Sequence, residues 1–253
     1  MLTDTEGIVL KQIKTSYNRR MILLFSRKYG KISAGTSIGE KGRSRSSLAL
    51  RPFTYGRYEL YKNRESYNIN SAEVLKSYYR IGEDVDKYMN GAYVLEFTEK
   101  ILSEEMQAPG LFDLLLDFFS LLENRSRGIG TLVLAYQTKA LGFCGVMPEL
   151  DHCTICGEKK EPFRFCVEEG GIICRECWEN LQKSSQHKLI YDVKFGIVDI
   201  LKYFRKEPFS AFEKIALDDA ILKKLNGIMK SWIAYHFDIG KLKSEGFSVT
   251  EPI

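Results

Sequence analysis

Short apolar and β-branched runs separated by polar turns fill the first part of the chain and predict β-strands. Within the longest run the residues alternate, which places Tyr58 and Leu60 on one face. Arg27–Gly30 reads as a hairpin turn. The predicted strands are Gly7–Ile13, Met21–Phe25, Lys31–Ala34, Phe53–Tyr61 and Tyr67–Asn70. Five short strands without a long helix among the first ones indicate an OB-type or an SH3-like barrel, and the pattern alone leaves both open.

After residue 84 the apolar positions recur with a period of about 3.6, which predicts helices. Pro109 suits the first position of the second helix, whose nearly all-round apolar surface places it at the centre of a bundle. Gly142 is expected to cap the third. The predicted helices are 84–102, 109–124, 131–141, 193–204 and 219–237. In the last helix the expected core seam is Ile221, Leu225, Ile228, Trp232 and Tyr235.

Four cysteines in a C-x2-C-x17-C-x2-C pattern give the most specific local signal: Cys153, Cys156, Cys174 and Cys177. Each short pair forms a tight turn that aims two sulfurs at one point, and tetrahedral zinc needs two such turns. The residues between the pairs read as a hairpin, so we expect a zinc ribbon holding one structural Zn²⁺. Unrelated core thiols or a redox dithiol explain two such pairs less well. Cys144 and Cys166 are expected in the core, and His152 outside the ligand set.

The composition is that of a soluble globular protein, with 44% apolar and 28% charged residues among 253. We expect no membrane-spanning helix and no secretory signal, and six cysteines then favour a reducing, cytoplasmic setting. The net charge of +4 is unevenly distributed. Residues 1–80 hold 16 Lys and Arg against 6 Asp and Glu, residues 81–150 hold 5 against 11, and residues 151–253 hold 16 of each. The predicted barrel is therefore strongly basic, which favours an anionic partner.

The basic residues concentrate in and around a flexible segment, residues 33–47, in which nine of fifteen residues are Gly, Ser or Thr. Cations on such a segment can follow a phosphate backbone. Tyr29, Phe53 and Tyr55 could stack on bases, although core packing explains such aromatics more often. The candidate nucleic-acid contacts are Arg19, Arg20, Lys28, Lys31, Lys41, Arg43, Arg45, Arg51 and Arg57.

Convincing catalytic motifs are missing from the sequence. It contains no H-E-x-x-H, no H-x-E, no P-loop and no G-x-G-x-x-G. One G-x-S-x-G match, Gly35–Gly39, falls in the basic segment, where no strand-to-helix elbow is expected. A binding protein without enzymatic activity is therefore the simpler expectation.

Motifs in a fixed order along about 170 residues resemble the bacterial RecO recombination-mediator family. They are Gly7–Lys11, Tyr29–Ile32, Glu40–Ser46, Leu50–Phe53, Ala92–Glu96, Leu111–Leu115, Leu141–Phe143, Pro148–Asp151 and the four cysteines preceded by Gly170–Gly171. The family's basic loop resembles Lys41, Gly42, Arg43 and Arg45 here. Glu40 before the lysine, and Ser44 between the arginines, depart from the usual family pattern.

The resemblance implies an α+β multidomain protein with an OB-fold barrel at 1–80, a helical domain at 81–150, a zinc ribbon at 151–185 and C-terminal helices at 186–253. It further implies binding to single- and double-stranded DNA and annealing of complementary strands. With RecR, such a protein would aid RecA loading on strands coated by single-strand binding protein, whose C-terminal tail is a further expected partner. A zinc-ribbon transcription or translation factor is the alternative. A metalloenzyme would need an open metal position, which four thiolates do not leave.

Overall fold

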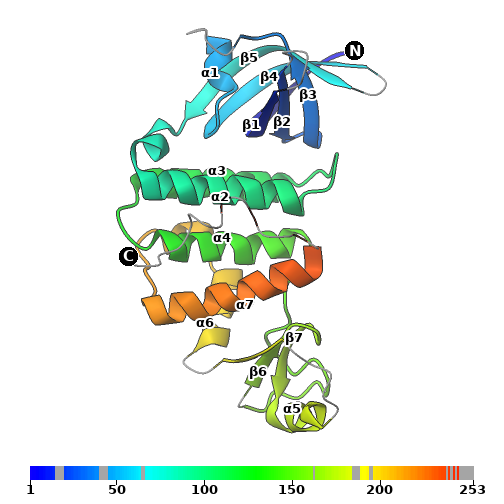
Figure 1. Ribbon diagram of the computed structural model, residues 1–253, viewed down its shortest axis with the longest axis vertical. Coiled ribbons are helices and arrows are strands. Elements are labelled where there is room, and N and C mark those ends of the chain that lie inside the picture. Colours follow the sequence, from blue (N-terminus) through cyan, green and yellow to red (C-terminus); the bar gives the residue numbers. More distant parts are fainter. Residues whose placement is uncertain are drawn as a thin grey trace. The chain divides into compact units, whose positions relative to one another are not determined.

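The computed structural model describes residues 1–14, 20–39, 45–63, 66–161, 163–183, 189–193, 196–237, 239, 242 and 244. The chain divides into two units, which are described separately: residues 1–130 with 241–253, and residues 131–240. Figure 1 labels their helices and strands. Strands prevail at the start of the chain and helices after it, so the expected α+β class is confirmed. The division into four domains is finer than these two units and stays a prediction.

The first unit begins with a closed five-stranded barrel (Figure 1). Its strands are β1 (Leu2–Lys14), β2 (Arg20–Ser26), β3 (Gly30–Thr36), β4 (Thr54–Lys62) and β5 (Tyr67–Ser77). They follow the order β1-β2-β3-β5-β4, and β4 also pairs with β1. All pairs are antiparallel except β3 with β5. A short helix, α1 (Arg45–Ala49), joins β3 to β4. This connectivity is that of the OB-fold, so of the two barrel types left open by the sequence it is the OB type that forms.

Alternation along the strands fills the barrel with apolar side chains. Tyr58 and Leu60, which the sequence places on one face of the strand, are fully buried and pack in one cluster with Val9 and Leu24. The Tyr58 hydroxyl donates a 2.6 Å hydrogen bond to the carbonyl oxygen of Ala49 at the end of α1. Burial raises the pKa of Tyr58, so the phenol stays a neutral donor. One buried phenol thus fastens α1 to the interior of the barrel.

A 3-10 turn, η1 (Tyr79–Glu83), leads from the barrel into α2 (Val85–Ile101) and α3 (Pro109–Asn124). Pro109 begins α3 as predicted, because its missing N–H costs nothing in the first turn. Seven of its sixteen residues are buried. Phe112 meets Phe25 of β2 edge to face at 5.3 Å, and the Arg27 guanidinium lies 4.6 Å from the Phe112 ring centre. The barrel and these helices therefore share one aromatic contact zone.

Gly30, at the start of β3, has a position that no other residue fits well. Its φ of +68° lies in the left-handed region, and a Cβ there would come within 2.1 Å of the Met106 carbonyl oxygen. Next to it, Lys31 accepts a backbone hydrogen bond from Glu105. The Tyr-Gly-Lys motif thus brings β3 against the segment between α2 and α3.

The second unit contains helices and a small sheet. Its helices are α4 (Ile129–Phe143), α5 (Arg175–Gln182), α6 (Ile197–Lys206) and α7 (Asp219–Phe237), with a 3-10 turn η2 (Phe209–Phe212). The strands β6 (Phe163–Cys166), β7 (Gly171–Cys174) and β8 (Ile190–Asp192) form a sheet in the order β7-β6-β8. The hairpin predicted between the cysteine pairs is therefore confirmed, whereas α5 and β8 were not predicted. None of the described helices is long and apolar enough to cross a bilayer.

Trp232 of α7 connects the sheet to the helices. The indole is buried, meets the Phe165 ring of β6 at 5.4 Å, and donates a 2.9 Å hydrogen bond to the carbonyl oxygen of Val146. The predicted seam of α7 was wrong at its two ends. Tyr235 is 53% exposed and Ile221 is partly exposed. The buried residues of α7 are Leu222, Leu225, Ile228, Met229, Trp232 and Ile233.

The end of α4 also differs from the prediction. Gly142 lies inside the helix, which continues to Phe143. Gly145, with φ +72°, takes the left-handed conformation after it, while the Val146 N–H donates to the Leu141 carbonyl oxygen. The glycine that ends α4 is therefore Gly145 and not the predicted Gly142.

Gly30→Ala should destabilise the protein by about 2–4 kcal/mol, because it combines a left-handed alanine with a clash against main chain. Urea unfolding followed by far-UV circular dichroism measures the loss. Gly39→Ala is the control, since a Cβ at Gly39 meets nothing within 4 Å. Equal midpoints for both variants would contradict the described approach of Met106.

Candidate metal centre and nucleic-acid interface

The first cysteine pair sits on a tight turn. The Cys153 N–H donates to the Glu158 carbonyl oxygen, and the Gly157 N–H donates to the Cys153 carbonyl oxygen, both at 2.9 Å. Gly157 has φ +74°, which lets the chain reverse directly after Cys156. The turn brings the Cys153 and Cys156 sulfurs to the same side.

The second pair lies where strand β7 becomes helix α5. Cys174 is the last residue of β7 and the N-cap of α5, and Cys177 falls in the first turn of that helix. Gly171, with φ +154°, lets the preceding turn approach Glu149, whose backbone pairs with Gly170 and Ile172. The glycine pair before the second cysteine pair thus has a structural role: it brings β7 against residue 149.

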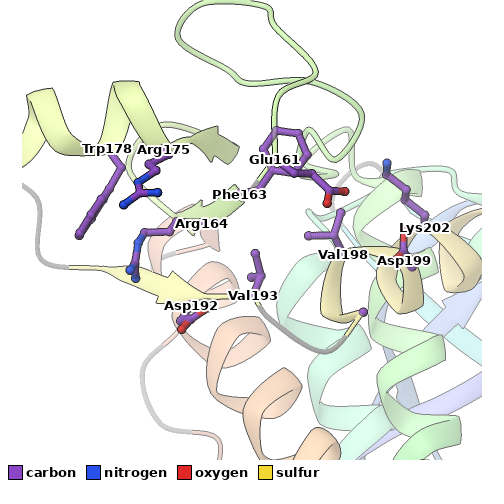
Figure 2. Close-up of a pocket in the computed structure, with 11 residues that line it drawn as sticks. Glu161, Phe163, Arg164, Arg175, Trp178, Asp192, Val193, Val198, Asp199 and Lys202 are labelled. Carbon is purple, nitrogen blue, oxygen red and sulfur yellow. The ribbon is translucent and has the colours of Figure 1, made fainter.

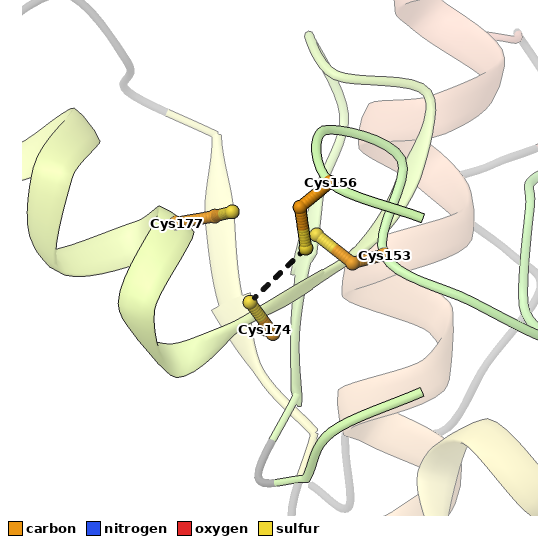
Figure 3. A group of neighbouring side chains, drawn as sticks. All are labelled: Cys153, Cys156, Cys174 and Cys177. Atoms are coloured by element: carbon orange, nitrogen blue, oxygen red, sulfur yellow. Dashed lines mark hydrogen bonds between the residues drawn. The ribbon is translucent and has the colours of Figure 1, made fainter. Parts of the chain in front are cut away.

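All four sulfurs lie within 4.8 Å of one another (Figure 3). The Cys156 and Cys174 sulfurs are 3.7 Å apart. A tetrahedral zinc with Zn–S bonds of about 2.3 Å requires sulfurs about 3.8 Å apart. The four predicted ligands are therefore brought together at a spacing that could hold a metal ion.

The electrostatics of the cluster favour a cation at its centre. Burial raises the pKa of Cys153, but hydrogen bonds from the backbone N–H groups of Cys156, Cys174 and Ile155 outweigh it and bring the pKa to about 6. Burial and the hydrogen bonds with the other three thiols raise the pKa of Cys177. The Cys153 thiolate forms readily, and its negative charge then disfavours ionisation of the neighbouring thiols. Four thiolates side by side therefore need a positive charge between them.

The remaining candidates near the cluster stay outside it. Cys166 is buried, and burial raises the pKa of its thiol to about 11. His152 places Nδ1 3.3 Å from the Glu149 carboxylate, and Cys144 is partly buried after α4. None of the three belongs to the group of residues that could hold the ion among those described.

A pocket of about 460 Å³ opens beside the sheet of the second unit (Figure 2). The Arg164 guanidinium stacks on the Trp178 ring at 4.0 Å on one wall. The charged lining residues are Arg164, Arg175 and Lys202, and Glu161, Asp192 and Asp199. Three cations and three anions give no preference for a phosphate. No Ser, Thr, Cys or His is among the described lining residues, so the lining offers neither a hydroxyl or thiol nucleophile nor a histidine base.

Two of the candidate DNA contacts make polar contacts within the first unit. The Lys31 side chain is 13% exposed; its Nζ donates to the Glu99 carbonyl oxygen at 3.0 Å and lies 3.7 Å from the Glu104 carboxylate. Arg20 donates to the Ile38 carbonyl oxygen and to the Gln12 side chain. The side chains of Lys31 and Arg20 are therefore largely engaged in contacts within the protein. The sequence alone did not reveal these contacts.

Three other candidates are exposed: Lys28 in the β2–β3 turn, Arg51 after α1 and Arg57 on β4. Arg51 and Arg57 have no carboxylate partner within ion-pair distance among the described residues. Lys28 follows β2 and Arg57 lies on β4, and β1 lies between these two strands in the barrel. Arg45 begins α1. Arg19, Lys41 and Arg43, and the side chain of Arg45, lie outside the described part of the structure.

The aromatic candidates are mainly packed. Phe53 is 6% exposed, and the Tyr55 hydroxyl donates to Glu6. Tyr29 is partly buried against Tyr67, with the Lys62 ammonium 5.6 Å from its ring centre. The contact between the Lys62 ammonium and the Tyr29 ring was not predicted from the sequence, because the two residues come together only when the barrel closes.

Comparison with known proteins covers nearly the whole chain. Residues 1–78 match the model of the family described as Recombination protein O N terminal, and residues 82–246 match Recombination protein O C terminal. The DNA repair protein RecO of Alkaliphilus metalliredigens is 28% identical over 94% of this chain and 95% of its own length. RecO of Caldanaerobacter subterraneus is 26% identical over 97% and 96%.

A higher identity over a shorter stretch is found with RecO of Bacillus subtilis, at 32% over 71% of this chain and 70% of that protein. The two family models meet at the junction of β5 with η1, where the barrel ends. With an OB barrel in the first segment and the cysteine cluster in the second, the chain belongs to the RecO family of DNA repair proteins.

Proposed function

We propose that this protein is a DNA-binding recombination mediator without enzymatic activity. It anneals complementary single strands and, with RecR, aids RecA loading onto strands coated by single-strand binding protein. Its place of action is the cytoplasm, at the nucleoid. The observation that carries this proposal is a net charge of +10 on residues 1–80, which form the OB barrel of a RecO-family chain.

The basic barrel acts on DNA through charge. Two complementary strands repel each other through their phosphates, and cations that replace condensed counterions lower this repulsion. The exposed cations Lys28, Arg51 and Arg57, with Lys41, Arg43 and Arg45 of the basic segment, supply those charges. Annealing then needs no bond to be made or broken by the protein.

The four cysteines have a structural part in this proposal. Cys153, Cys156, Cys174 and Cys177 would hold one Zn²⁺, which leaves no position for water or substrate. The ion supplies the positive charge that the four thiolates need, and this type of site contributes about 10–16 kcal/mol to the order of a small module. The ribbon core around them is small, with Cys153, Cys166, Ile173 and Cys174 as its buried residues.

The combined variant Lys41→Ala/Arg43→Ala/Arg45→Ala should weaken binding to single strands of every sequence. Because each phosphate contact adds about 0.7 to the salt slope, the slope of log K against log salt should fall by about 2. Fluorescence anisotropy with a labelled oligonucleotide at several salt concentrations measures both. The control, Lys206→Ala/Lys214→Ala/Lys223→Ala, removes equal charge from exposed positions of the second unit. An unchanged slope in the first variant would remove these three residues from the interface.

Mixing complementary strands labelled as a fluorescence donor and acceptor tests the annealing itself. The protein should speed annealing several-fold over the uncatalysed reaction, and it should do so with single-strand binding protein present, with and without RecR. Low salt should favour the effect, since the mechanism is electrostatic. A preference for RNA or duplex, with no acceleration of annealing, would instead favour a zinc-ribbon transcription or translation factor.

Metal removal tests the cysteine site. Protein purified without chelator should carry close to one zinc per chain, measured by plasma emission spectrometry. Cys153→Ser should lose the zinc and become sensitive to trypsin between residues 151 and 183, because the turns lose their common ligand. Cys144→Ser, outside the cluster, should keep both the zinc and the resistance. A wild-type zinc content far below one would refute the assignment.

A further inference from the structure

A second cavity, of about 660 Å³, lies in the first unit beside the end of α1. Its walls come from the segment after α1, from β5, and from η1 and the first turn of α2. Four of the twelve lining residues are aromatic. The lining residues that matter here are Arg51, Phe53, Glu73, Tyr78, Tyr79 and Tyr88.

Two of these rings are presented to solvent. Tyr79 is 62% exposed and Tyr88 is 46% exposed. The Tyr88 ring meets the buried Phe53 edge to face at 5.6 Å, and Phe53 meets the Phe119 ring at 5.6 Å in the same way. The exposed face of Tyr88 is therefore held in place by a buried aromatic stack, which limits the entropy that a ligand must remove when it binds.

Phe53 has an unusual backbone. Its φ of +57° lies in the left-handed region, which a bulky residue seldom adopts. The conformation is held because the Phe53 carbonyl oxygen accepts a 3.0 Å hydrogen bond from the Tyr78 N–H. Such strain persists where the surroundings impose it, and it is frequent at binding sites. Here it turns the Phe53 side chain under Tyr88.

The described lining of the cavity holds one cation, Arg51, and one carboxylate, Glu73. Arg51 is exposed and has no carboxylate partner within ion-pair distance among the described residues, and Arg80 is exposed next to Tyr79. The one carboxylate in the described lining, Glu73, is the cross-strand neighbour of Arg57. Arg80 and the acidic residues at 83, 84 and 86 are not among the lining residues, so the polar recognition in this cavity depends on Arg51.

Helix α1, which follows the basic segment in the sequence, ends at this cavity. Helix α1 has five residues, Arg45–Ala49, and so spans about 7.5 Å. Leu48 and Arg51, at its end, already line the cavity.

We propose that this cavity receives unstacked bases of a single DNA strand. Tyr79 and Tyr88 stack on the bases, and Arg51 meets the adjoining phosphate. The inference rests on the proposed DNA binding and deepens it, because it assigns a base site in addition to the phosphate contacts. Bases in a duplex are already stacked on their neighbours, so the site selects single strands.

Tyr79→Ala/Tyr88→Ala tests the proposal by anisotropy with single-stranded and duplex oligonucleotides. Stacking on an aromatic ring strengthens binding by about fivefold or more per base, so the variant should lose at least that factor on single strands. Its salt slope should stay at the wild-type value, because no phosphate contact is removed. Tyr79→Phe/Tyr88→Phe should restore binding, and Tyr235→Ala, an exposed tyrosine of α7, should leave it unchanged.

An oligonucleotide with abasic positions gives a second readout that does not depend on the folding of a variant. Wild-type protein should bind it at least about fivefold more weakly than the intact strand, while the double Ala variant should bind the two alike. Wild-type protein that binds intact and abasic strands equally, or an Ala variant that binds as wild type, would overturn the base site and leave the proposed function standing. Absence of any DNA binding by the wild type would overturn both.

Discussion

The short parallel pairing between β3 and β5 is the constraint on which the barrel of the first unit depends. It joins three residue pairs, Ala34 with Tyr67 to Thr36 with Ile69, and it closes the barrel. Parallel neighbours cannot be joined by a tight hairpin, so the chain must cross the barrel end before β4. That crossing carries the basic segment, α1 and Arg51. The pairing that closes the barrel therefore also determines where α1 and Arg51 lie.

The cysteine ribbon of the second unit depends on a different interaction. The apolar residues of its ribbon are few, and the turns that hold Cys153 and Cys177 end in groups that repel one another once ionised. A divalent ion held between the four sulfurs, as proposed above, would convert this repulsion into attraction. Contacts outside the cluster then fasten the ribbon: Phe165 against Trp232, and Asp151 with Arg205 at 2.8 Å. The hydrogen bond from Arg205 lowers the pKa of Asp151, which stays charged at neutral pH.

Local patterns were sufficient for the strands, for the long helices and for the four cysteines. Period and turn residues determine these features within a few neighbouring positions, and the span of α3 from Pro109 is an example. Features that depend on distant contacts were missed. The burial of Lys31 under the end of α2, the exposure of Tyr235 and the pairing of Lys62 with Tyr29 all follow from how elements pack. The basic charge of residues 1–80 was thus evident from the sequence, whereas which cations are available to DNA was not.

The placement of the two tryptophans has a spectroscopic consequence. Trp178 is stacked by Arg164 beside the cysteine cluster, and Trp232 is buried in the contact between ribbon and α7. Both belong to residues 131–240, and the barrel contains no tryptophan. Emission excited at 295 nm therefore reports on the ribbon and its helices alone. Unfolding followed by this signal and by far-UV circular dichroism would separate the two units without any introduced label.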